Sequence, residues 1–186
     1  GIPNVRSYDP TFGFEVTVIL QHGTKRMMED QVDEYYYVTL MNENYTHPEM
    51  PEGAAEGIVK GMYLLTDAGK PKKGELRVQL LGSGTILREA IAAAELLDKD
   101  FGVTADIWSC PSFNELARDG EDATRHNRLN PEAKDKRVPY VTQLLAGRQG
   151  PAIAATDYVR TFANQVREFV PMRYVVLGTD GFGRSD

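Results

Sequence analysis

The sequence has little cysteine and no long apolar run, and each shortage excludes a class of protein. Cys110 is the single cysteine among 186 residues, which excludes an internal disulfide or a cysteine-caged metal and favours a reducing, cytoplasmic location. No apolar run approaches the roughly 20 residues of a membrane span, and Gly1–Arg6 lacks the layout of a signal peptide. We therefore expect no membrane association.

The sequence also has fewer basic than acidic residues. The 21 Lys and Arg residues are outnumbered by 27 Asp and Glu residues, which leaves a formal net charge of −6 at pH 7. The basic residues form no cluster of the kind that nucleic-acid phosphates require. The composition therefore argues against a nucleic-acid partner.

Residues that commonly carry catalysis or bind metals are sparse. His22, His47 and His126 are the only histidines, and none stands at metal-ligand spacing from another ligand. The chain has no Gly-x-Ser-x-Gly nucleophile elbow and no phosphate-binding P-loop. From these residues we predict no catalytic, cofactor-binding or metal-binding side chain in the chain.

The clearest pattern covers residues 76–101, with an apolar run, a Gly-Ser-Gly turn and a helical stripe. The run over 76–81 is typical of a strand that is covered on both faces. The apolar positions of the following helix are Ile86, Leu87, Ile91, Ala94 and Leu97. Gly102 ends this helix and residues 103–110 form the next strand, so the segment predicts a right-handed βαβ unit.

The remaining patterns extend this unit. Strands are predicted over 35–41, 151–156 and 173–178. One helix is predicted to follow a turn at residues 8–12 and to run to about residue 28, and another is predicted over 158–170. A capping box at Ser112 begins a short helix, and a charged surface loop or irregular helix follows over 117–137. Residues 53–65 favour a weak helix or a glycine-kinked strand. The alternation of strands and helices predicts an α/β fold, a three-layer α/β/α sandwich.

The composition also divides the chain near residue 50. Residues 45–53 hold two prolines and little apolar surface, as an interdomain linker does. Residues 1–44 contain one predicted helix and one predicted strand, too few elements to close a core. We interpret them as the end of an α/β domain, and residues 54–186 as a second domain.

The turn Gly82–Thr85 admits two interpretations. It matches a dinucleotide-binding fingerprint in its first two glycines, but Leu87 stands where the third glycine belongs. One interpretation is a plain strand-to-helix turn. The other is an anion site at Ser83, Gly84 and Thr85, because free amides at the start of a helix favour negative charge.

Several short segments together resemble one family. These segments are Ile2–Asn4, Tyr8–Pro10, Tyr35–Tyr37, Asn42–Tyr45, Met50–Gly53, Leu81–Gly84, Ser112–Gly120 and Leu177–Asp186. They are similar to the C-terminal part of the homodimeric bacterial pyruvate dehydrogenase decarboxylating components, a transketolase-like, thiamine-diphosphate-dependent family. The resemblance runs from one end of the chain to the other.

The resemblance implies both a fold and an activity for the parent protein. The fold is a transketolase-like C-terminal domain, truncated at its end and preceded by the last helix and strand of a pyrimidine-binding domain. The parent is a homodimer that decarboxylates pyruvate on thiamine diphosphate with magnesium and reductively acetylates the lipoyl group of the dihydrolipoyl acetyltransferase component.

The resemblance also implies that the family's catalytic and magnesium-binding residues lie upstream of Gly1. The chain itself is then expected to supply structural and dimerisation surface, to bind neither cofactor and to be inactive alone. The alternative is an independent nucleotide- or anion-binding α/β module that uses Gly82–Thr85.

Overall fold

The computed structural model describes residues 2–181. The strands are β1 (Val5–Tyr8), β2 (Tyr35–Val38), β3 (Tyr63–Thr66), β4 (Leu76–Gly82), β5 (Val103–Ser109), β6 (Ala152–Val159) and β7 (Tyr174–Thr179). The α-helices are α1 (Gly13–Thr24), α2 (Ala54–Lys60), α3 (Gly84–Phe101), α4 (Phe113–Leu129), α5 (Tyr140–Leu145) and α6 (Arg160–Asn164). A π-helical turn (Lys25–Glu29) extends α1, and a 3-10 turn (Arg167–Phe169) follows α6.

The main sheet has five strands in the order β3-β5-β4-β6-β7. Strand β3 is antiparallel to β5, and the other neighbouring pairs are parallel. Strands β4 and β5 pair from Leu76 opposite Val103 to Gly82 opposite Ser109, with α3 connecting them. The predicted βαβ unit is therefore confirmed, including the end of its helix at Gly102, which has a φ of 63°.

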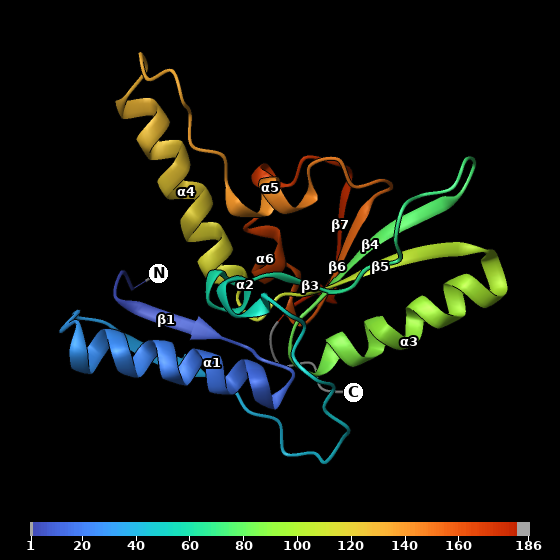
Figure 1. The fold of residues 1–186 in the computed structure, drawn as a ribbon, viewed down its shortest axis with the longest axis horizontal. Coiled ribbons are helices and arrows are strands. Elements are labelled where there is room, and N and C mark those ends of the chain that lie inside the picture. Colours follow the sequence, from blue (N-terminus) through green and yellow to red (C-terminus); the bar gives the residue numbers. More distant parts are fainter. Residues whose placement is uncertain (1, 182–186) are drawn as a thin grey trace.

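Helices cover both faces of this sheet, with α3 on one side and α4, α5 and α6 on the other (Figure 1). The larger core lies beneath α4, α5 and α6, where Leu81, Trp108 and Phe113 are almost completely buried. Burial of each such side chain contributes about 1.5–3 kcal/mol to folding. The predicted three-layer α/β/α sandwich is confirmed.

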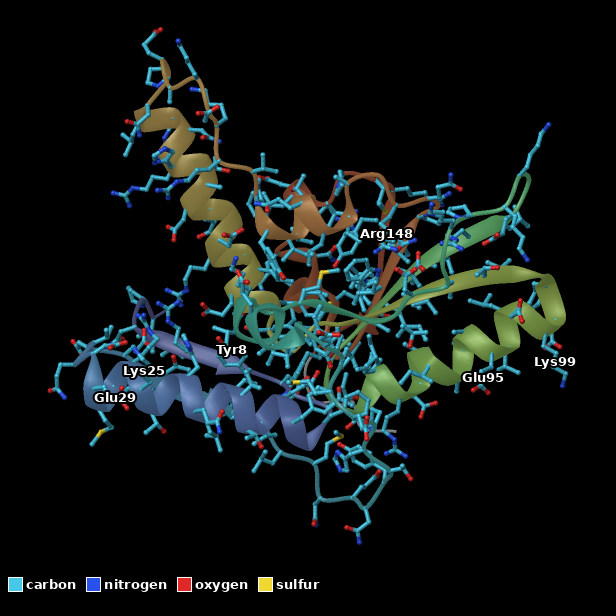
Figure 2. The ribbon with its side chains drawn as sticks, viewed as in Figure 1. Tyr8, Lys25, Glu29, Glu95, Lys99 and Arg148 are labelled. Atoms are coloured by element: carbon cyan, nitrogen blue, oxygen red, sulfur yellow. The ribbon has the colours of Figure 1, made fainter. Side chains whose placement is uncertain are left out.

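Helix α3 turns its predicted stripe toward the sheet, but only part of that stripe is fully covered. Leu87 is completely buried, whereas Ile86, Ile91, Ala94 and Leu97 are half-buried. Near the end of the helix, Leu96 and Phe101 are exposed. Glu95 and Lys99 point away from the sheet (Figure 2). The predicted face is right, and its burial is greatest in the first turns of the helix.

The prediction of a surface loop or irregular helix over 117–137 was wrong for its first half, because α4 is a regular helix as far as Leu129. The buried residues of α4 are Phe113, Leu116, Ala117, Gly120 and Ala123. Three of these are too small to mark an apolar stripe in the sequence. A Cβ at Gly120 would lie 2.3 Å from the ring of Phe169, so a small residue is needed where the helix meets the body.

The predicted helix over 158–170 was also wrong in its extent. Strand β6 continues to Val159, opposite Thr179 of β7, after an irregularity in the pairing. Only the five residues of α6 are α-helical, and the 3-10 turn follows them. Of the apolar positions that predicted this helix, Val166 is buried, whereas Val159, Phe162 and Phe169 are half-buried. Pairing with β7 extended the strand at the expense of the helix, which periodicity alone did not show.

Two further segments contain more elements than predicted. Residues 53–65 form both a helix, α2, and a strand, β3, separated by Gly61, whose φ of 97° requires glycine. Strand β1 was not predicted, and it pairs in parallel with β2. The predicted first helix and the strand beginning at Tyr35 are present, the strand ending at Val38.

The N-terminal elements, which are β1, α1 and β2, pack directly on the rest of the chain (Figure 1). A second core cluster joins Tyr8 and Ile19 to Ala54, Ile58 and Tyr63, which belong to α2 and β3. The division into residues 1–44, a linker over 45–53 and a domain over 54–186 stays a prediction. Within residues 2–181, no helix combines the length and apolar character needed to cross a bilayer.

Candidate functional site

The turn between β4 and α3 was the predicted anion site, and the structure places part of the chain's own N-terminal segment against it. Gly84 has a φ of 52°, and its amide donates to the carbonyl oxygen of Asp9 at 3.0 Å. The hydroxyl of Thr85 lies 2.9 Å from the sulfur of Met41. The Ser83 hydroxyl is buried and has no hydrogen-bond partner within the described residues.

The carboxylate of Asp9 supplies a negative charge at this turn. A Cβ at Gly84 would lie 2.5 Å from Asp9 Oδ2, so only glycine allows this approach. Burial raises the pKa of Asp9, and the hydrogen bond from Thr39 Oγ1, at 2.5 Å, opposes that rise. An added anion would have to share this position with the Asp9 carboxylate. Anion binding at Ser83, Gly84 and Thr85 stays a prediction.

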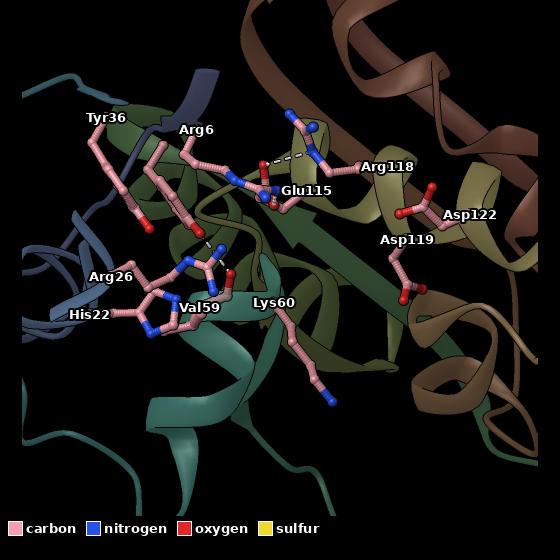
Figure 3. A pocket seen from close by; sticks show the side chains of 11 residues that line it. Arg6, His22, Arg26, Tyr36, Val59, Lys60, Glu115, Arg118, Asp119 and Asp122 are labelled. Atoms are coloured by element: carbon pink, nitrogen blue, oxygen red, sulfur yellow. Dashed lines mark hydrogen bonds and ion pairs between the residues drawn. The ribbon is translucent and has the colours of Figure 1, made fainter. Parts of the chain in front are cut away.

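A second candidate is a polar cleft of about 290 Å³ between the N-terminal elements, α2 and α4 (Figure 3). Strand β1 contributes Arg6, the region of α1 contributes His22 and Arg26, and α2 contributes Lys60. Helix α4 contributes the remaining charged side chains, which are Glu115, Arg118, Asp119 and Asp122. We call this the polar cleft.

The charges of the polar cleft are largely paired. Arg6 contacts Glu34 at 3.1 Å and Glu115 at 2.7 Å, and it thereby joins the loop before β2 to α4. Arg26 also pairs with Glu34. Arg118 pairs with Glu115 (Figure 3). Hydrogen bonding from Arg26 lowers the pKa of Glu34 to about 2, against the opposing effect of burial. The network is an ionic link between the N-terminal elements and α4.

His22 is the one histidine that lines the polar cleft within the described residues. Burial lowers its pKa, and the charge of nearby Arg26 lowers it further, so both effects favour the neutral imidazole. The hydroxyl of Tyr8, which also lines the cleft, donates to the carbonyl oxygen of Val59 at 2.8 Å. The arrangement binds the surrounding elements together, and it presents no nucleophile beside a base.

A completely buried acid, Glu15, lies elsewhere and was not identified from the sequence. The carboxylate of Glu15 is completely buried and accepts hydrogen bonds from Tyr63 Oη at 2.7 Å and from Ser109 Oγ at 2.5 Å. The amides of Thr11 and Phe12 donate to its second oxygen. Burial raises the pKa of Glu15. The one local signal was its place in the first turn of α1, where a glutamate caps backbone amides.

The three histidines do not meet in the structure. His22 lines the polar cleft, His126 lies on α4, and His47 accepts a hydrogen bond from the amide of Gly13 at 3.0 Å. No group of three His, Cys, Asp or Glu side chains within residues 2–181 is arranged to hold a metal ion. The absence of catalytic, cofactor-binding and metal-binding residues stays a prediction for the whole chain.

The five-stranded, mostly parallel sheet with helices on both faces defines the class of protein. Residues 61–186 match the family model described as the transketolase-like TK C-terminal domain, and residues 1–48 match that of the pyruvate dehydrogenase E1 component middle domain. The chain therefore belongs to the transketolase-like C-terminal domain family. The interval between the two matches overlaps the predicted linker.

Its relatives make the assignment more particular. The chain is 60% identical over 185 residues to the pyruvate dehydrogenase E1 component of Cupriavidus necator, with 100% of this chain and 20% of that protein covered. The same component of Pseudomonas aeruginosa is 58% identical, with 100% of this chain and 21% of that protein covered. The component of Escherichia coli K12 is 54% identical, with 100% and 20% covered. The chain thus spans about a fifth of the length of these relatives.

Solved structures show the same fold. Transketolase from Campylobacter jejuni superposes with a TM-score of 0.59 at 20% identity, covering 99% of this chain and 23% of that one. Transketolase from Pichia stipitis in complex with sedoheptulose 7-phosphate also gives 0.59, at 16% identity, covering 98% of this chain and 22% of that one. The predicted resemblance to bacterial pyruvate dehydrogenase components and the predicted transketolase-like fold are confirmed.

Proposed function

We propose that this chain is part of a protein that decarboxylates pyruvate on thiamine diphosphate and reductively acetylates the lipoyl group of a dihydrolipoyl acetyltransferase component. The observation that carries the proposal is the whole-chain identity of 60% to a protein named pyruvate dehydrogenase E1 component. The match of residues 1–48 to a middle domain of that component supports it. The alternative of an independent anion-binding module is not favoured, because it depends on the Gly82–Thr85 turn alone.

The described residues do not fit thiamine diphosphate or its magnesium ion. No cluster of carboxylates and histidines within residues 2–181 offers a metal a set of ligands. At the one helix start that was predicted to favour an anion, the carboxylate of Asp9 lies against Gly84 and would repel a diphosphate. We therefore assign both cofactors to other parts of the parent protein, and a structural role to residues 1–186.

That structural role includes assembly. We propose that the parent is a homodimer in the cytoplasm and that this chain contributes surface to the dimer. Large apolar side chains remain exposed, Tyr37 on β2 and Leu177 on β7 among them, at 64% and 55% of their surface. These side chains are available to pack against a second subunit.

The activity is tested with the parent protein. An antibody raised against residues 1–186 should deplete the source-cell extract of carbon dioxide release from carboxyl-labelled pyruvate, and the captured protein should restore it with thiamine diphosphate and magnesium. An antibody against an unrelated protein is the control. Unchanged release after complete depletion of the protein would overturn the proposal.

The structural role is tested with the chain itself. Purified residues 1–186 should release no carbon dioxide from pyruvate and should give no saturable heat when titrated with thiamine diphosphate and magnesium. The captured parent protein serves as the positive control in both measurements. Saturable binding to residues 1–186 at micromolar concentration would contradict the assignment of the cofactors to other parts of the parent.

A further inference from the structure

A second cavity, of about 470 Å³, lies apart from the polar cleft and from the turn after β4. It is formed between residues 45–51, α3 and the end of β3. Figure 1 shows residues 45–51 as a chain without helix or strand that runs past the start of α3. We call this cavity the linker pocket. Its size lies in the range of small-molecule sites in proteins.

The floor of the linker pocket is apolar. Phe12, Leu65 and Ile91 line it, and all three belong to the core cluster that surrounds Leu87 and Ile107. Phe12 is almost completely buried, whereas Leu65 and Ile91 are half-buried because residues 45–51 do not close over them. The pocket is thus an opening into a hydrophobic core. An apolar group placed there would remove further core surface from water.

One cation stands at the wall of this pocket. The guanidinium carbon of Arg88 lies 4.5 Å from the centre of the Tyr45 ring, in a cation–π contact. Arg88 also pairs with Glu43 at 2.8 Å, but the Glu43 side chain is 62% exposed. An exposed pair of this kind is weak and exchanges readily. A guanidinium has five donors, so it can bind a second carboxylate while it remains stacked.

The aromatic wall is fixed before any ligand arrives. The hydroxyl of Tyr45 donates to the carbonyl oxygen of Thr11. The Tyr45 ring also stacks on His47, with centres 4.6 Å apart, and His47 is held by the amide of Gly13. A wall that is already ordered reduces the entropy that binding would otherwise cost.

We propose that the linker pocket binds a small monocarboxylate with an apolar body, such as an arylalkanoate. The apolar body packs against Phe12, Leu65 and Ile91, and the carboxylate replaces Glu43 on Arg88. Glu49 also lines the pocket, so a second negative charge on the ligand meets repulsion. The proposal concerns a site outside the proposed catalytic function and does not depend on it.

The probe for this site is 4-phenylbutanoate, titrated into residues 1–186 by calorimetry and by observation of the amide resonances of α3. We expect saturable binding at millimolar concentration or below. Arg88→Gln should weaken it about tenfold, because a charge-assisted hydrogen bond is lost. Glu43→Gln should strengthen it about threefold by removing the internal competitor. Arg128→Gln, on distant α4, is the matched control and should change nothing.

Two comparisons keep the result interpretable if Arg88→Gln unfolds. Ile91→Phe fills the floor of the pocket and should abolish binding with the charge of Arg88 intact. With the unaltered chain, 4-phenylbutanol and phenylsuccinate should both bind about tenfold more weakly than 4-phenylbutanoate, because one lacks the charge and the other carries a second one. The absence of saturable binding to the unaltered chain would overturn the proposal, and so would binding that Ile91→Phe and Glu43→Gln leave unchanged.

Discussion

The hydroxyl of Ser109 donates a hydrogen bond of 2.5 Å to the carboxylate of Glu15, although 94 positions separate the two residues. Glu15 belongs to α1 and Ser109 to the end of β5, so the contact joins the N-terminal elements to the main sheet. Tyr63, from β3, donates to the same oxygen of Glu15 at 2.7 Å. One buried carboxylate therefore joins three separate parts of the chain.

We predict that Glu15→Ala destabilises the chain by about 3–5 kcal/mol, because it leaves several buried donors without an acceptor. Urea unfolding at neutral pH measures the change in the free energy of unfolding. Glu89→Ala, on the exposed side of α3, is the matched control and should stay within about 0.5 kcal/mol of the unaltered chain. Equal effects of the two substitutions would contradict the structural role of Glu15.

The ion pairs of Glu34 predict a pH dependence of stability. Its pKa falls from 4.5 to about 2 on folding, chiefly through the hydrogen bond from Arg26. The stabilisation is therefore present above pH 4.5 and is lost as the pH falls through about 2. Glu34→Gln should destabilise the chain by about 2 kcal/mol at neutral pH.

That difference should shrink when unfolding is measured at decreasing pH. Glu121→Gln, on the exposed side of α4, should show no comparable trend. A difference between Glu34→Gln and the unaltered chain that stays constant from neutral to acid pH would show that the ion pairs of Glu34 do not stabilise the fold.

The burial of α3 predicts unequal costs along one helix. Leu87→Ala should cost about 2–5 kcal/mol because Leu87 is completely buried, and Ile91→Ala should cost less because Ile91 is half-buried. Leu96→Ala should change the free energy of unfolding by no more than about 0.5 kcal/mol. Chemical unfolding of the three variants provides the comparison. A larger loss for Leu96 than for Leu87 would mean that the opposite face of α3 meets the sheet.

The position of Asp9 predicts how the turn after β4 responds to anions. The unaltered chain should show no sulfate-dependent rise in melting temperature beyond the general effect of salt, since the Asp9 carboxylate lies against Gly84. Asp9→Ala should acquire such a rise, because the carboxylate no longer repels an anion from the Ser83 hydroxyl and the positive end of α3. Asp157→Ala, which retains Asp9, is the control. An equal rise in all three proteins would show that sulfate does not compete with Asp9.

Self-association should depend on the exposed apolar residues of the sheet edges. Leu177→Asp should convert a dimer of residues 1–186 to a monomer if β7 lies in the interface, whereas Tyr37→Asp should do so if β2 does. Sedimentation of the two variants at micromolar concentration distinguishes a dimer interface on β7 from one on β2. Our proposal that this chain contributes surface to the dimer requires one of these two results. A monomeric unaltered chain would contradict it.

Local pattern was sufficient for the elements whose apolar residues are large and regularly spaced. The run from Leu76, the turn at Ser83 and the stop at Gly102 predicted β4, α3 and β5 in sequence order, and the structure has all three. The resemblance of short segments predicted the family, which the relatives confirm. The three elements could be predicted because the pattern of each depends only on residues that are near one another in the sequence.

Only the tertiary structure decided where small and polar residues would be buried. Helix α4 packs through Ala117 and Gly120, whose small size allows close approach but carries no periodic signal. Nothing in the sequence near Glu15 indicates that this acid is buried. Tyr63 and Ser109, from distant strands, donate hydrogen bonds to it in the interior. The polar cleft and the linker pocket likewise join segments far apart in the chain. Their residues meet through long-range packing, and the free energy of that packing is not encoded in any one segment.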